Sequence, residues 1–76
     1  MSDASRGPVK RSVTIAGHRT SLSLEPEFWD ALNALATVRN VPLAGLVAAI
    51  DEARGRTNLS SALRVAVLQA TRTGEI

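Results

Sequence analysis

The apolar residues of the stretch 19–35 change from one periodicity to another, and this change constrains the fold most strongly. Leu22 and Leu24 alternate with Ser21 and Ser23, a pattern typical of a short strand with one apolar face. A strand needs a neighbour, because its backbone donors and acceptors must be paired. Few other segments of the sequence could supply this neighbour. We therefore expect the strand to pair with the same strand of a second molecule.

A helix follows the strand. Pro26 suits a first helical position, and Phe28 and Leu32 then recur at helical spacing. Asn40 accepts the left-handed conformation that often ends a helix. The sequence therefore predicts a helix from residue 26 to about residue 39.

Two further helices are predicted after this one. Pro42 opens the second helix, and a cap residue, Asn58, precedes the third. The second helix carries one apolar stripe, formed by Leu43, Leu46, Val47 and Ile50. The third helix has a broader apolar surface, which we expect to contact both its own domain and a partner subunit.

Residues 10–16 could form another strand, because Val13 and Ile15 alternate with polar residues. Their parity is opposite to that of Leu22 and Leu24, so one regular strand would put the two sets on opposite faces. A turn or bulge at residues 16–18 must correct this, and Gly17 is suited to it. Whether the two segments form a hairpin or one extended strand stays open.

A chain of 76 residues without cysteine has a small core and no disulfide to stabilise it, so oligomerisation is expected. One histidine without cysteine gives no basis for a structural zinc site. No run of about 20 apolar residues suits a membrane span, and residues 1–12 do not resemble a secretory signal. We expect a cytoplasmic protein with residues 1–9 as a flexible basic arm and residues 10–76 as a single domain.

The positive charge is concentrated before Glu25, although the nine Lys and Arg exceed the seven Asp and Glu by only two. The cationic residues of this segment are Arg6, Lys10, Arg11 and Arg19, against Asp3 alone. A basic segment beside a polar strand favours a polyanionic partner, most commonly nucleic acid.

Pairing the strand with its symmetry mate would produce a two-stranded ribbon. Its apolar side chains would face the helices, while Arg19, Ser21 and Ser23 of both copies would face outward. Such a ribbon fits the major groove of B-form DNA, where Arg can bind guanine with two hydrogen bonds and Ser can contact several base edges.

The order strand, helix, helix resembles the ribbon-helix-helix family of dimeric DNA-binding proteins. The resemblance is carried by Thr-Ser-Leu-Ser-Leu-Glu-Pro-Glu-Phe-Trp-Asp-Ala-Leu at residues 20–32. Residues 10–21 and 58–65 are similar to a bacterial subfamily of these proteins. The resemblance implies a mostly α-helical, intertwined ribbon-helix-helix dimer with a short N-terminal strand and an additional C-terminal helix.

The resemblance also implies that the start of the second helix grips phosphate, although Pro42 lacks the side-chain donor that the family often has there. We assign base contacts to Arg19, Ser21 and Ser23. The predicted phosphate contacts are Lys10, Arg11, His18, Leu43 and Ala44. The predicted dimer core contains Leu22, Leu24, Phe28, Leu32, Leu46 and Ile50. Trp29 is expected to be a packing residue, and no catalytic residue, metal or cofactor is expected.

The sequence therefore predicts a transcriptional repressor that binds double-stranded DNA as a homodimer or higher oligomer, and not an enzyme. One alternative is an antitoxin-like DNA-binding protein that also binds a partner protein through its C-terminal helix. Another is a dimeric protein-interaction module in which the ribbon serves only dimerisation.

Overall fold

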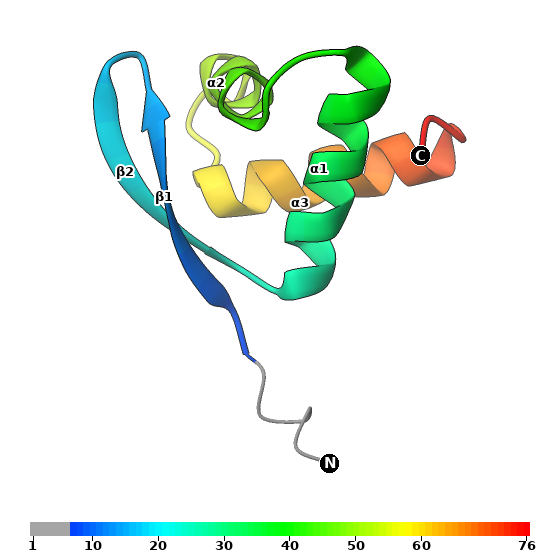
Figure 1. Ribbon diagram of the computed structural model, residues 1–76, viewed down its shortest axis with the longest axis horizontal. Coiled ribbons are helices and arrows are strands. Elements are labelled where there is room, and N and C mark those ends of the chain that lie inside the picture. Colours follow the sequence, from blue (N-terminus) through cyan, green and yellow to red (C-terminus); the bar gives the residue numbers. More distant parts are fainter. Residues whose placement is uncertain (1–6) are drawn as a thin grey trace.

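The computed structural model describes residues 7–76, in which an antiparallel hairpin precedes three helices (Figure 1). The predicted fold class, mostly α-helical with a strand at the start and an additional helix at the end, is confirmed. Residues 1–6 of the expected basic arm lie outside the described residues, and Val9 is already part of the sheet. The elements are β1 (Val9–Ile15), β2 (His18–Leu24), α1 (Pro26–Arg39), α2 (Leu43–Ala53) and α3 (Leu59–Arg72).

A two-residue turn joins the strands. Its central residues, Ala16 and Gly17, have positive φ angles of 52° and 81°, as a type I′ turn requires. Ile15 and His18 face each other directly across the turn. The segments that could have formed a hairpin or one extended strand therefore form a hairpin, with Gly17 in the predicted turn.

The expected pairing of β2 with a second molecule would use the other edge of the strand and stays a prediction, whereas the neighbour that the structure shows is β1 of the same chain. The physical reason is the short turn, which reverses the chain with little entropic cost. The reversal also resolves the parity conflict, since Val13 and Ile15 come to lie on the same face as Leu22 and Leu24.

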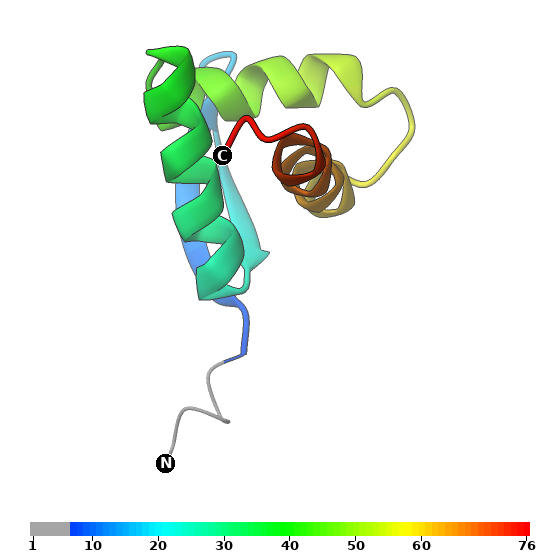
Figure 2. The same cartoon turned by 90° about the vertical axis from the view of Figure 1, so that its right-hand side faces the viewer.

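The three helices lie on one side of the hairpin (Figure 1), and Figure 2 views the molecule from that side. Apolar side chains from both strands and all three helices meet between them in one continuous core. The buried side chains are Val13, Ile15, Leu22, Leu24, Trp29, Leu32, Leu35, Ala36, Leu46, Val47, Leu63, Val67 and Ala70.

Four of the six residues predicted for a dimer core, Leu22, Leu24, Leu32 and Leu46, are buried inside this single-chain core. The other two, Phe28 and Ile50, are partly buried and pack against it. Their role between subunits stays a prediction.

Helix α1 ends as the sequence predicts. Asn40 has a φ of 58°, and its N–H donates to the Thr37 carbonyl at 3.0 Å. The axes of α1 and α2 then differ by 98°. Within residues 7–76 no single helix is long and apolar enough to cross a membrane, and only this sharply bent pair reaches that length and composition together.

Polar contacts cap the start of α3 and connect this helix with the start of α1. The side chain of Asn58 accepts a hydrogen bond from the Ser61 N–H at 3.2 Å, which confirms the predicted cap. The Arg64 guanidinium lies 2.9 Å from the Glu25 carboxylate at the start of α1. The pKa of Glu25 is lowered mainly by a backbone hydrogen bond and to a smaller extent by this guanidinium. The Glu25 side chain makes no capping hydrogen bond to α1.

Candidate nucleic-acid interface

The face of the hairpin that points away from the helices is entirely polar. Residues opposite each other in an antiparallel pair lie on the same face, so the register places three cross-strand pairs on it. All six side chains are exposed, and none is acidic. The pairs are Lys10 with Ser23, Ser12 with Ser21, and Thr14 with Arg19.

This face, called here the outward face, contains one ammonium, one guanidinium and four hydroxyl groups. A two-stranded ribbon can enter the major groove, where such groups can donate to or accept from base edges. The three predicted base contacts, Arg19, Ser21 and Ser23, all lie on the outward face. The sequence reasoning missed Ser12 and Thr14, although their alternation with apolar residues contained the signal.

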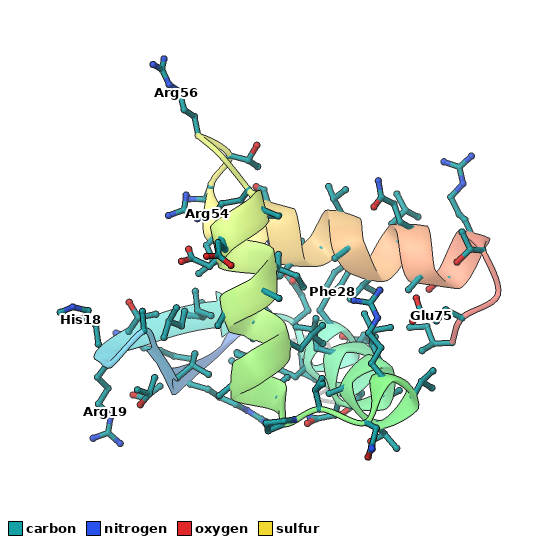
Figure 3. All side chains as sticks on the ribbon, turned by 90° about the horizontal axis from the view of Figure 1, so that it is seen from above. His18, Arg19, Phe28, Arg54, Arg56 and Glu75 are labelled. Carbon is teal, nitrogen blue, oxygen red and sulfur yellow. The ribbon has the colours of Figure 1, made fainter. Side chains whose placement is uncertain are left out.

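The residues predicted to contact phosphate lie in different surroundings. Lys10 is on the outward face, whereas Arg11 is on the other side of the sheet, with its guanidinium carbon 5.2 Å from the centre of the Trp29 ring. His18 and Arg19 are exposed beside the turn and point in different directions (Figure 3). Arg11, whose guanidinium lies over the Trp29 ring, is therefore placed for packing against that ring.

The start of α2, at Leu43 and Ala44, is the other region predicted to contact phosphate. Leu43 is partly buried and Ala44 is exposed, and Pro42 at the cap position makes no side-chain capping bond. The first helical hydrogen bond of α2 is donated by the Leu46 N–H to the Pro42 carbonyl at 3.0 Å. The N–H groups earlier in the helix therefore have no acceptor within it. This end of α2 carries the positive end of the helix dipole.

In a comparison with known families, the model of the ribbon-helix-helix domain matches residues 8–71 of the chain. The chain belongs to the ribbon-helix-helix family. Ribbon-helix-helix domains bind DNA, typically to regulate transcription, and they dimerise; their fold is not an enzymatic one. No curated protein and no solved structure gives a significant match to the chain.

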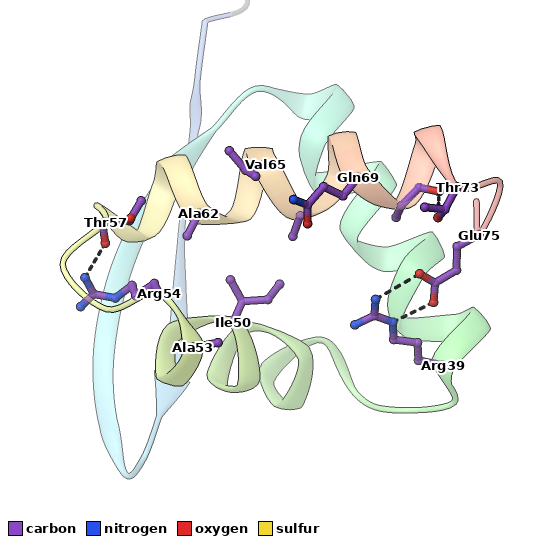
Figure 4. A pocket seen from close by; sticks show the side chains of 12 residues that line it. Arg39, Ile50, Ala53, Arg54, Thr57, Ala62, Val65, Gln69, Thr73 and Glu75 are labelled. Atoms are coloured by element: carbon purple, nitrogen blue, oxygen red, sulfur yellow. Dashed lines mark hydrogen bonds and ion pairs between the residues drawn. The ribbon is translucent and has the colours of Figure 1, made fainter.

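A second feature of this ribbon-helix-helix chain is a groove of about 590 Å³ between α2 and α3 (Figure 4). Its walls are mostly apolar and include Ile50 and Val65. The ion pair between Arg39 and Glu75, with atoms 2.8 Å apart, closes one end of the groove. Within residues 7–76 no cluster of three or more His, Cys, Asp or Glu residues could hold a metal ion.

Proposed function

We propose that this protein binds double-stranded DNA sequence-specifically and acts as a transcriptional repressor in the bacterial cytoplasm. The observation that carries the proposal is the outward face, where two paired strands present six exposed hydrogen-bonding side chains without a carboxylate. Family membership supports the same function and a homodimer as the acting species. The protein, bound in the major groove of an operator, would then exclude other proteins from that DNA.

The proposed roles follow from position and chemistry. Arg19 binds a guanine edge through two hydrogen bonds, while Ser21 and Ser23 contact neighbouring bases. Contacts with phosphate come from Lys10 and His18 and from the free N–H groups of Leu43 and Ala44. The position of Arg11 over Trp29 favours a packing role for this cation.

Selection of bound sequences from random DNA tests the proposal, followed by affinity measurements on the selected duplex. Arg19→Ala should lower specific affinity about 5- to 150-fold, because a bidentate base contact is worth about 1–3 kcal/mol. The control is Arg72→Ala at the end of α3, which removes the same charge from an exposed position far from the hairpin. An unchanged operator affinity of the Arg19 variant would contradict the proposal, as would the absence of any preferred sequence.

A partner protein bound through α3 is the second candidate function. The groove between α2 and α3 favours this function. So do two apolar side chains on α3, because Val65 is 48% exposed and Leu68 is 53% exposed. Val65→Asp should then abolish a stable complex purified from the native host. Val38→Asp is the matched control, since Val38 is 57% exposed but lies on α1 outside the groove. Equal behaviour of the two variants would exclude the groove as the docking surface.

A further inference from the structure

We infer that β1 is a phosphate-binding strand of the dimer, in which Lys10, Ser12 and Thr14 of each chain contact the DNA backbone beside two central β2 strands that read the bases. This inference rests on the proposed DNA-binding function of a homodimer and on the predicted pairing of β2 with β2 of the second chain. It assigns a ligand to Ser12 and Thr14, two exposed residues of the outward face to which the proposed function gives no role.

The order of the strands in the dimer follows from the hairpin. Strand β1 occupies one edge of β2, so a second chain can pair with β2 only at the other edge. Antiparallel pairing of the two β2 strands about a two-fold axis then produces a sheet of four strands. The two β2 strands are central in this sheet, and the two β1 strands are outermost. Each β1 strand therefore keeps one free edge.

The backbone at this free edge has unused hydrogen-bond donors. Hydrogen-bonded and non-hydrogen-bonded pairs alternate along an antiparallel ladder, and the turn makes Ile15 and His18 a hydrogen-bonded pair. The pairs of the outward face are therefore non-hydrogen-bonded, and the N–H groups of Lys10, Ser12 and Thr14 point away from β2. Within residues 7–76 no backbone carbonyl outside the sheet accepts a hydrogen bond from them. The same alternation turns the N–H groups of the outward residues of β2 to its other edge, where a second β2 strand would accept them.

The width of the major groove places β1 at the groove walls. Adjacent strands lie about 4.8 Å apart, so the two central strands fit a groove about 12 Å wide. The outermost strands lie about 14 Å apart before their side chains are counted, which exceeds the width of the groove. Each β1 strand therefore meets one wall of sugar and phosphate, and its free edge faces phosphate oxygens.

The outward side chains of the two strands differ as this arrangement requires. The cation of β2 is Arg19, whose planar guanidinium suits a guanine edge, whereas the cation of β1 is Lys10, whose ammonium binds phosphate as a point charge. The hydroxyl groups of Ser12 and Thr14 can donate to phosphate oxygens. All three side chains of β1 are exposed, and none is acidic. Each chain therefore offers side-chain and backbone donors from the same three residues to one wall of the groove.

The experiment compares the two strands on two kinds of DNA. Selection from random DNA with the full-length protein supplies an operator duplex, and affinities are measured for this duplex and for one of scrambled sequence. The β1 variant, Ser12→Ala with Thr14→Ala, should lose at least about fivefold on both duplexes and keep the selected motif, because phosphate contacts act on every sequence. The β2 variant, Ser21→Ala with Ser23→Ala, should lose affinity mainly for the operator and relax the preference at individual positions.

Neutral methylphosphonate groups at single positions of the operator locate the contacts. Those beside the motif should weaken binding of the wild type, and the β1 variant should be insensitive to them, since both changes remove the same interaction. Ser12→Thr with Thr14→Ser keeps both hydroxyl groups and should bind as the wild type does. The matched control is Thr71→Ala with Thr73→Ala, which removes two hydroxyl groups at the exposed end of α3, far from the hairpin (Figure 1). The fluorescence of Trp29 tests whether each variant is folded.

A relaxed base preference of the β1 variant would overturn the inference, and so would an unchanged affinity for both duplexes. The proposed function would survive either result, because sequence-specific binding through the β2 strands does not depend on the role of β1. If the wild-type protein selects no sequence, the proposed function fails together with the inference.

Discussion

The indole N–H of Trp29 in α1 donates a hydrogen bond of 2.9 Å to the carbonyl oxygen of Val9, the first residue of β1. Trp29 is only 1% exposed, so this bond ties the start of the sheet to the core. Trp29→Phe should lower the free energy of unfolding by about 1–2 kcal/mol, because the bond is lost and the ring site is less well filled. Urea denaturation measures the loss, and amide exchange should show that β1 opens first. Val38→Ala on the exposed side of α1 should leave both readouts unchanged.

Arg11 and Lys10 are adjacent in sequence but should differ in their effect on DNA binding. Arg11→Ala removes the guanidinium over Trp29 and should lower stability by about 0.5–1 kcal/mol, with little change in the salt dependence of DNA affinity. Lys10→Ala removes a cation from the outward face and should reduce the slope of log affinity against log salt by about one. Titrations at several salt concentrations distinguish the two residues. Equal slopes for both variants would contradict these assignments.

The turn offers a test of the hairpin itself. Gly17→Ala should destabilise the protein by about 1–2 kcal/mol, since alanine is unfavourable at a φ of 81°. A methyl group there would meet no atom within 4 Å, so the cost comes from the backbone conformation and not from a clash. Gly7→Ala also places its methyl group in open space but lacks the positive φ, and it should be neutral. Thermal unfolding of both variants decides the matter, and an unaffected Gly17 variant would be inconsistent with the type I′ turn.

Acid should weaken the attachment of α3. The pKa of Glu25 is lowered by a backbone hydrogen bond and then by Arg64, and the pKa of Glu75 is lowered by its hydrogen bond with Arg39. A carboxyl group with a lowered pKa in the folded state contributes stability above its unfolded pKa of about 4.3. That stability is lost as the pH falls through the lower folded-state values.

Chemical denaturation between pH 7 and pH 3 measures this loss. Glu25→Gln and Glu75→Gln remove the titrating groups, so each variant should be less stable at pH 7 and should lose less stability in acid than the wild type. If both variants follow the wild-type pH profile, the two ion pairs do not contribute to the acid response.

The helices could be predicted well from sequence because their ends depend on local chemistry. Pro26 and Asn40 define α1, and Asn58 caps α3, each through contacts within a few residues. The opposite parity of Val13 and Leu22 also predicts a turn or bulge at residues 16–18, and the structure shows the turn. These features required no knowledge of the tertiary structure.

Other features depend on contacts between residues far apart in the chain. The pairing of β1 with β2 was missed as the favoured arrangement, because Ala-Gly is a weaker hairpin signal than Asn-Gly. The contact between the Glu25 carboxylate and Arg64, 39 residues later, is one of these contacts. Alternation separates Ser12 and Thr14 from the apolar residues of their own strand, but only the register shows that they share the outward face with Arg19.

Both strands of the hairpin belong to one polypeptide, and this affects how recognition could change during evolution. In a ribbon built from two identical strands, every mutation alters two symmetric contacts at once. In the hairpin of β1 and β2, each of the six outward positions is encoded separately. A single codon change therefore alters one of the six side chains of this face in a chain and leaves the other five as they were, so the chemistry of the face can shift in small, independent steps.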